Sequence, residues 1–241
     1  MADPKPPTPV PAPVPTPDPS PLLPLTDTAG GPTPLLRAPL THLTDTLRRA
    51  TVTGPRAVSV REIPYAVMLS LRVEPGSAAA TRIERHLKAR LPARCGETAP
   101  VSPAGTLLWL GPDEWLLVTP PGSRPPTAEL HQALAGAPGS VVDVSANRTT
   151  LELRGPSARP VLEKGCPLDL HPRSFPPGQA HTTQLGPAPL ILWHTANTPE
   201  TPETPNTPED TWHLLPRASY ADYVARWLVD AMTEFAGPEV A

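Results

Sequence analysis

The side chains most suggestive of chemistry lie in the stretch "EKGCPLDLHPRSFPPG", residues 163–178. Cys166 and His171 are the residue types of a thiol nucleophile and its general base. Together with Asp169 they are also the residue types that bind metal ions such as zinc. The stretch therefore raises two chemical hypotheses, a Cys–His nucleophile pair and a metal site.

The spacing of these residues favours neither hypothesis. Cys166 and His171 are five residues apart in a proline-flanked loop, where two side chains rarely meet at one point, and no third residue is placed to orient the histidine. A structural zinc site needs four ligands, and Cys95 or His181 could be recruited, but nothing in the spacing requires it.

The same stretch is explained more simply as the end of a helix. Gly165 closes the predicted helix 157–165 in the position of a left-handed C′ glycine, and Pro167 prevents the helix from continuing. Lys164 lies in the last turn, where a positive charge suits the helix dipole. We therefore predict a helix end followed by a fixed crossover loop, in which Phe175 is a packing residue.

Other sequence signatures of catalysis are missing. The chain has no G-x-x-x-x-G-K-[ST] phosphate loop, no G-x-G-x-x-G dinucleotide motif and no H-E-x-x-H motif. It also lacks a G-x-S-x-G nucleophile elbow and paired C-x-x-C motifs. These absences weaken the case for an independent enzyme, and we predict no catalytic, cofactor-binding or metal-binding residue in this chain.

The composition limits the kinds of partner. The 241 residues carry a net charge of −3, which argues against a nucleic acid, since phosphate binding needs a clustered basic surface. No apolar run approaches the ~20 residues of a membrane span, and the polar N-terminus lacks a signal sequence. With only two cysteines, the simplest expectation is a reduced, cytoplasmic protein.

The 40 prolines are unevenly placed and divide the chain. Residues 1–56 are predicted to be a proline-rich disordered arm and linker, either a solubilising tail or a ligand of SH3-type domains. Residues 57–238 are predicted to fold. Within them, the Thr-Pro-Glu repeat of residues 195–210 is predicted to be a surface loop insertion.

The folded part has the pattern of mixed helices and strands. Alternating and apolar runs predict strands at 66–73, 148–154, 190–193 and 212–215. Residues 106–119 contain two apolar runs joined by Gly-Pro-Asp-Glu, which predicts a hairpin. Amphipathic periodicity predicts helices at 77–91, 127–136, 157–165 and 219–235. Ser77 is the expected N-cap of the first helix, Pro92 its expected stop, and Ser219 with Asp222 a capping-box signature of the last helix.

Two halves of this region resemble each other. Leu107-Leu108-Trp109 parallels Ile191-Leu192-Trp193, and Trp115-Leu116-Leu117 parallels Trp212-His213-Leu214. We predict an α+β fold of two strand–helix–strand–strand–helix units with antiparallel sheets, about 57–137 and 138–238, each preceded by a short strand.

Several residues are structural or interface candidates. In "DVSANRTTLEL", the polar residues Asp143, Ser145 and Asn147 suit a turn, and Arg148 could contact a partner subunit or ligand. The tryptophans are expected to pack in the sheets or at an interface, and Arg217 is expected to be solvated. The full set of candidates is Trp109, Trp115, Arg148, Gly165, Cys166, Asp169, His171, Trp193 and Trp212.

The segments "LGPDEWLL" (110–117), 142–178, "ILW" (191–193) and "ASYADYVARWLVDA" (218–231) resemble the gamma subunit of heterotetrameric sarcosine oxidase. The resemblance spans about 58–236 and agrees in order and spacing. "GCPLDL" and the Leu-Gly-Pro-Asp-Glu-Trp segment are its most specific parts. The proline-rich arm and the Thr-Pro-Glu insertion depart from the family pattern.

This resemblance implies a structural subunit without its own catalytic site, similar in fold to the folate-binding glycine-cleavage T protein. The complex oxidatively demethylates sarcosine to glycine and releases hydrogen peroxide with 5,10-methylenetetrahydrofolate or formaldehyde. FAD, FMN, NAD, zinc and tetrahydrofolate are expected in the alpha, beta and delta subunits and none in this chain.

Two alternatives stay open at this point. The chain could be a stand-alone tetrahydrofolate-binding protein of the T-protein fold, or an adaptor that captures partners through its proline-rich arm.

Overall fold

The structure is a computed structural model that describes residues 23–24, 35–103, 105–195 and 210–237. The chain divides into two compact units, residues 1–37 and 38–241. In the first unit, β1 (Leu23–Pro24) pairs antiparallel with β2 (Leu35–Leu36). Residues 1–22 and 25–34 of the predicted arm lie outside the described residues.

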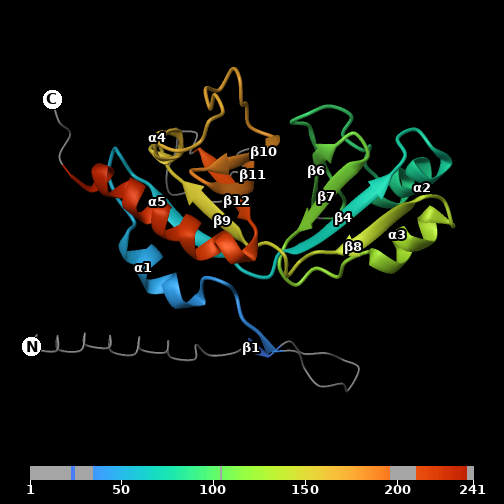
Figure 1. The fold of residues 1–241 in the computed structure, drawn as a ribbon, viewed down its shortest axis with the longest axis horizontal. Coiled ribbons are helices and arrows are strands. Elements are labelled where there is room, and N and C mark those ends of the chain that lie inside the picture. Colours follow the sequence, from blue (N-terminus) through green and yellow to red (C-terminus); the bar gives the residue numbers. More distant parts are fainter. Residues whose placement is uncertain (1–22, 25–34, 104, 196–209, 238–241) are drawn as a thin grey trace, which may run out of the picture. The chain divides into compact units, whose positions relative to one another are not determined.

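The second unit contains two five-stranded antiparallel sheets (Figure 1). One has the strand order β5-β6-β7-β4-β8 and the other the order β10-β11-β12-β9-β3. The strands of the first sheet are β4 (Val67–Val73), β5 (Thr98–Pro100), β6 (Thr106–Gly111), β7 (Glu114–Thr119) and β8 (Gly139–Asp143). Those of the second are β3 (Ser59–Ile63), β9 (Thr150–Arg154), β10 (Gln179–Leu185), β11 (Ala188–His194) and β12 (Thr211–Pro216).

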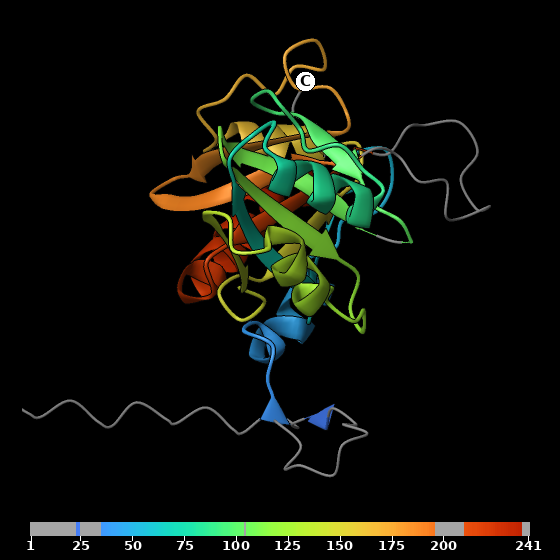
Figure 2. The ribbon, with the colours of Figure 1, turned by 90° about the vertical axis from the view of Figure 1, so that its right-hand side faces the viewer.

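Helices cover the outer face of each sheet. Figure 2 looks onto α2 (Ala78–Leu87) and α3 (Thr127–Leu134), which cover the first sheet. The helices α1 (Thr44–Arg49), α4 (Ala158–Glu163) and α5 (Ala221–Ala236) lie on the side of the second sheet. Two short 3-10 helices, Thr41–Leu43 and Ala218–Tyr220, precede α1 and α5.

Alternation along the strands separates three apolar clusters. In β4, Leu69 and Leu71 face α2 and α3, whereas Met68 belongs to the cluster between the sheets. In β11, Leu190 and Leu192 face the helices of the second sheet, and Ile191 meets Met68 in the central cluster. Because successive strand residues point to opposite faces, fully apolar strands can bury both faces, one under helices and one against the other sheet.

The two halves repeat in topology, as predicted, but each short leading strand joins the opposite sheet. β3 precedes the first half and pairs with β9 of the second, and β8 precedes the second half and pairs with β4 of the first. Each of the predicted units, about 57–137 and 138–238, therefore gives one strand to the sheet of the other. The exchange ties the halves together, since neither sheet is complete without a strand from the other half. The edge strands β5 and β10 were not predicted.

The predicted parallel between Trp109 and Trp193 is wrong by one residue. Trp109 lies opposite Trp115 in the first sheet, and the residue opposite Trp212 in the second is His194. Trp109 packs under the helices, whereas Trp193 belongs to the cluster between the sheets. A shift of one residue moves a side chain to the other face of a sheet, so the counterpart of Trp109 is His194.

The helix ends follow the predictions in part. The Oγ of Ser77 accepts the backbone N–H of Ala80 over 3.1 Å, which confirms the predicted N-cap. That helix ends at Leu87 with Lys88 in the left-handed region, more than three residues before Pro92.

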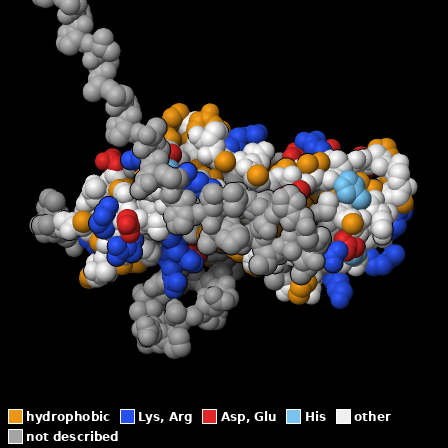
Figure 3. Space-filling model, turned by 90° about the horizontal axis from the view of Figure 1, so that it is seen from below, with side chains coloured by type: hydrophobic (Ala, Val, Ile, Leu, Met, Phe, Trp, Pro, Cys, Tyr) orange, Lys and Arg blue, Asp and Glu red, His pale blue; other side chains and the backbone are white. Residues whose placement is uncertain are grey.

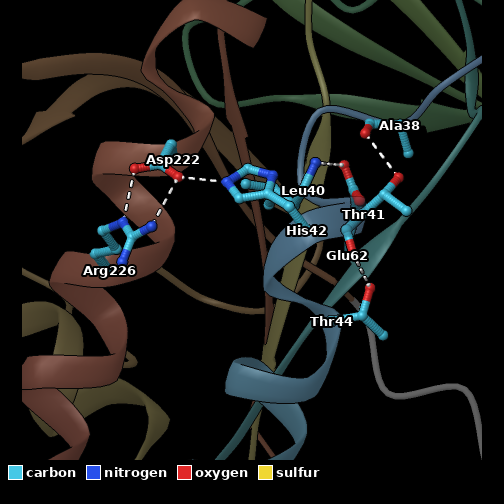
Figure 4. Close-up of polar contacts among 8 residues, drawn as sticks. All are labelled: Ala38, Leu40, Thr41, His42, Thr44, Glu62, Asp222 and Arg226. Atoms are coloured by element: carbon cyan, nitrogen blue, oxygen red, sulfur yellow. Dashed lines mark hydrogen bonds and ion pairs between the residues drawn. The ribbon is translucent and has the colours of Figure 1, made fainter. Parts of the chain in front are cut away.

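The predicted capping box of Ser219 and Asp222 is not formed. Asp222 instead accepts hydrogen bonds from His42 over 2.7 Å and from Arg226 over 2.8 Å, as Figure 4 shows. Ser219 lies inside the 3-10 helix Ala218–Tyr220 that precedes α5, and the N-cap position of α5 is Tyr220, which makes no side-chain cap bond.

The folded unit begins nearly twenty residues before the predicted boundary at residue 57. Leu40, Leu43 and Leu47 are at most 4% exposed and belong to the core under α4 and α5. The backbone N–H of Leu40 donates to Glu62 of β3 over 3.3 Å (Figure 4). Leu40, Leu43 and Leu47 form a Leu-x-x-Leu-x-x-x-Leu pattern with helical spacing. The prediction missed this pattern because residues 1–56 were assigned to the arm by their proline content.

The Thr-Pro-Glu segment connects two paired strands. Residues 196–209 lie outside the described residues, but Thr195 and Thr211 on its two sides are hydrogen bonded, the backbone N–H of Thr195 donating over 3.0 Å. β11 and β12 are therefore a hairpin, as β6 and β7 are around Gly111 and Glu114. In the described part of the chain, no helix combines the length and apolar character that crossing a bilayer requires.

Candidate functional site

The stretch 163–178 begins, as predicted, at the end of a helix. α4 ends at Glu163, and the Nζ of Lys164 donates to the carbonyl oxygen of Ala231 on α5 over 2.6 Å. Gly165, however, does not have the predicted left-handed conformation. A Cβ on Gly165 would lie 2.6 Å from the Cζ2 atom of Trp227, so a glycine is needed there for space.

The three reactive-type side chains of this stretch make separate local contacts. Cys166 is half-buried, with its Sγ 3.9 Å from the Oγ1 of Thr183. Asp169 accepts the backbone N–H of His171 over 3.0 Å and the hydroxyl of Ser174 over 2.5 Å, and these hydrogen bonds lower the pKa of its carboxyl.

His171 is exposed, and its Nδ1 accepts the backbone N–H of Arg173 over 3.2 Å. The contacts of Asp169 and His171 fix the loop. Within the described ranges, no three His, Cys, Asp or Glu side chains gather in the way a metal ion would require.

A different cysteine does meet a histidine. Cys95 is exposed, and its Sγ lies 3.7 Å from the Nδ1 of His181 on β10. The Nε2 of His181 lies 3.2 Å from the Oε1 of Gln179, two residues away on the same strand. Burial lowers the pKa of His181. The sequence offered no signal for this pairing, because the two residues are 86 positions apart.

The turn between β8 and β9 shows the predicted turn chemistry at Asp143, whereas the side chains of Ser145 and Asn147 accept hydrogen bonds from Met68 and Arg217. Asp143 accepts the backbone N–H of Ser145 over 2.9 Å, and the Oγ of Ser145 accepts the backbone N–H of Met68. Arg148 donates to the carbonyl oxygen of Leu215 over 2.9 Å, and burial together with nearby Arg217 lowers its pKa. Arg148 therefore anchors this turn to β12.

The four candidate tryptophans all pack within the sheets. Trp115 is buried and its Nε1 donates to the carbonyl oxygen of Pro92 over 2.8 Å. Trp212 is fully buried and stacks on His194, with ring centroids 4.0 Å apart. Trp109 and Trp193 are partly exposed. Contacts of these residues with a partner stay a prediction.

His194 was not among the candidates predicted from the sequence. It is buried, its Nδ1 donates to the carbonyl oxygen of Phe175 over 3.1 Å, and its Nε2 lies 3.5 Å from Asp210. Burial is the main cause that lowers its pKa. Its position opposite Trp212 and under Phe175 makes it a core residue, and Phe175 packs as predicted.

A row of polar side chains crosses the inner face of the second sheet. Arg61, Glu152, His213 and Trp193 lie opposite one another on four neighbouring strands. Arg61 and His213 lie 2.6 Å and 3.4 Å from the Glu152 carboxylate. Burial alone would raise the pKa of Glu152, but these hydrogen bonds and charges lower it to about 2. The row pairs a mostly buried carboxylate with two partners and is structural.

The comparisons with known proteins agree over most of the chain. The family described as "Sarcosine oxidase, gamma subunit family" matches residues 73–234. A sarcosine oxidase subunit gamma from Arthrobacter sp is 43% identical over 209 residues, which are 87% of this chain and 96% of that protein. The chain belongs to the sarcosine oxidase gamma subunit family.

A second gamma subunit, from Corynebacterium sp. strain U-96, is 42% identical over 216 residues, 89% of this chain and 98% of that protein. In a solved structure, a chain of the heterotetrameric sarcosine oxidase from Corynebacterium sp. U-96 in complex with pyrrole 2-carboxylate has a TM-score of 0.77 and 41% identity. That alignment covers 86% of this chain and 99% of that one.

The gamma subunit family also shares its fold with a second kind of protein. The glycine cleavage aminomethyltransferase T from Bartonella henselae has a TM-score of 0.55 at 16% identity, covering 79% of this chain and 56% of that one. At this identity the likeness shows the fold alone. It confirms the predicted T-protein-like α+β fold.

Proposed function

We propose that this chain is the gamma subunit of a heterotetrameric sarcosine oxidase and that its role in the complex is structural. The observation that carries the proposal is the likeness, along almost the whole chain, to a subunit of a solved heterotetramer. The complex would oxidatively demethylate sarcosine to glycine, with hydrogen peroxide and 5,10-methylenetetrahydrofolate or formaldehyde as products. The alpha, beta and delta subunits would hold FAD, FMN, NAD, zinc and tetrahydrofolate.

The separate contacts of Cys166, Asp169 and His171 support a structural role. Nucleophilic catalysis needs a base within hydrogen-bond reach of the nucleophile, and the Sγ of Cys166 is placed against a threonine hydroxyl. Asp169 and His171 hold their own loop. These contacts fix the end of α4 and the loop that follows it.

Co-expression of the other three subunits with and without this chain tests the assembly role. We expect the complex to be lost or insoluble without it, because obligate interfaces are large and apolar. Full activity of the three subunits alone would contradict the proposal. In the complete complex, Cys166→Ser should leave turnover within about twofold, since the thiol lies beside the hydroxyl of Thr183 and against the apolar core, where a small hydroxyl can replace it.

The T-protein-like fold is the observation that favours a second candidate, a stand-alone tetrahydrofolate-binding protein. Titrating the purified chain with tetrahydrofolate while following tryptophan fluorescence distinguishes the two. Micromolar binding by the isolated chain would favour this second candidate, and no binding together with capture of three subunits favours the first.

A further inference from the structure

Cys95, His181 and Gln179 form a line of three side chains at the junction of the two sheets. Cys95 lies in the turn before β5, and Gln179 and His181 lie on β10, the edge strand of the other sheet. The backbone pairing of Gly96 with Ala180 brings the two segments together, and the N–H of Ala180 donates to Gly96 over 3.1 Å.

The hydrogen bonds along this line define the state of the imidazole. The Oε1 of Gln179 can only accept, so the Nε2 of His181 carries the hydrogen that it shares over 3.2 Å. The lone pair of Nδ1 is then free to accept the S–H of Cys95, 3.7 Å away. Burial lowers the pKa of His181, which favours the neutral imidazole, the form that can take a proton.

The imidazole is held in place by its surroundings. The ring of Phe175, which is buried, lies edge-on to the ring of His181 with centroids 4.7 Å apart. Gly96 has a φ of +83°, and a Cβ there would lie 2.6 Å from the Nε2 of His181. The glycine at position 96 therefore leaves space for the imidazole of His181. With a larger residue at position 96, the imidazole would have to move.

We propose that Cys95 is a reactive thiol, activated by His181 and oriented through Gln179, and that it is a site of oxidation by hydrogen peroxide. A nucleophile, a base and a group that orients the base are the three parts that activate a thiol. Cys95 is exposed, so a small oxidant can reach it. In the other cysteine, Cys166, the polar group described beside the sulfur is the hydroxyl of Thr183.

The oxidation step balances with peroxide as the only co-reactant. The Sγ of Cys95 transfers its proton to His181 and attacks one peroxide oxygen, so an S–O bond forms as the O–O bond breaks. The leaving hydroxide takes the proton from His181 and departs as water. The sulfur loses two electrons and becomes a sulfenic acid, and the peroxide is reduced.

The chain offers an internal reference for the test, because it has two cysteines. The purified full-length chain is treated with iodoacetamide at pH 7, and the modification rates of Cys95 and Cys166 are measured separately by peptide mass spectrometry. In a parallel arm, hydrogen peroxide is added and sulfenic acid is trapped with dimedone. We expect Cys95 to react about tenfold faster than free cysteine and to be the main site of trapping.

His181→Gln should lower the Cys95 rate about tenfold, and Gln179→Ala should lower it less. The Cys166 rate should stay unchanged in both, which also reports that the fold is intact. The matched control is His171→Gln, which replaces an exposed histidine elsewhere.

Equal Cys95 rates in the parent and in His181→Gln, with the Cys166 rate unchanged, would overturn the proposal. If His181→Gln unfolds the chain and so raises the Cys166 rate, the Cys95 rate of Gln179→Ala is used instead. A Cys95 rate in Gln179→Ala equal to that of the parent would then overturn the proposal. A Cys95 rate no faster than free cysteine, or dimedone on Cys166 alone, would also overturn it. None of these outcomes depends on assembly with other subunits.

Discussion

Trp227 of α5 packs so closely against Gly165 that its ring lies where any side chain at that position would begin. The contact joins the end of α4 to α5, and Lys164 beside it reinforces the joint through the carbonyl oxygen of Ala231 and the carboxylate of Glu234, 2.7 Å away. At the scale of the residue, position 165 therefore requires glycine, because the ring of Trp227 occupies the space that a side chain would need.

Gly165→Ala is expected to lower the free energy of unfolding by about 1–3 kcal/mol, because a Cβ would overlap the ring of Trp227. Chemical denaturation measures the change. Gly237→Ala is the control, since its Cβ would meet no atom closer than 3.9 Å. Adding Trp227→Leu to Gly165→Ala should recover part of the loss, and full additivity of the two changes would contradict the steric explanation.

At the scale of the elements, the row of Arg61, Glu152 and His213 connects β3, the exchanged strand, to β9 and β12. Cross-strand pairs of opposite charge stabilise a sheet when they lie directly opposite each other. Glu152 is the centre of the row, with a side chain only 12% exposed. The exchange of strands is thus supported by a polar contact as well as by the backbone ladder.

The stability of the fold should depend on pH through Glu152. Its pKa in the folded state is about 2, lowered from an ordinary value of 4.5, so its stabilisation is present above pH 4.5 and is lost as the pH falls toward 2. The expected loss is on the order of 2 kcal/mol, since exposed Arg61 is screened by solvent.

Urea denaturation between pH 6 and pH 2.5 measures this dependence. Glu152→Gln should be less stable at pH 6 and lose less stability on acidification. Glu163→Gln, which replaces an exposed glutamate on α4, is the control. Parallel pH curves for the parent and Glu152→Gln would show that the row does not contribute.

At the scale of the whole molecule, the described basic and acidic side chains are interspersed over the face shown in Figure 3. Beneath the surface, three apolar clusters hold helices on the outside and the two sheets against each other. The core under α4 and α5 includes leucines that precede β3, so the folded unit starts at Ala38.

Two truncated chains test this boundary. A chain that starts at Ala38 should unfold at the same temperature as the full chain. A chain that starts at residue 57 loses Leu40, Leu43 and Leu47, each worth about 2 kcal/mol of buried apolar surface, and should not fold stably. Leu43→Ala in the full chain should lower the free energy of unfolding by about 2–4 kcal/mol. Equal melting of both truncated chains would refute the boundary.

The sequence by itself determined the helices α2 to α5, most of the strands, the two hairpins, the repeat and the family, but not α1, which lies in the predicted arm. These features depend on local periodicity and turn residues: Ser77 caps its helix as predicted, and Gly111 to Glu114 turns between two strands. Such signals lie within a few neighbouring residues, so one sequence contains them.

Only the tertiary structure decided which strands pair and which distant side chains meet. The exchange of β3 and β8, the need for space at Gly165 and the contact of Cys95 with His181 each join segments far apart in the chain. Periodicity determines which face of a strand is buried. Which strand pairs with the edge of a given sheet depends on packing over the whole fold. The composition around Cys166 suggested a cysteine–histidine pair in that stretch. The pair that the fold forms is Cys95 with His181, because tertiary packing brings these two segments together.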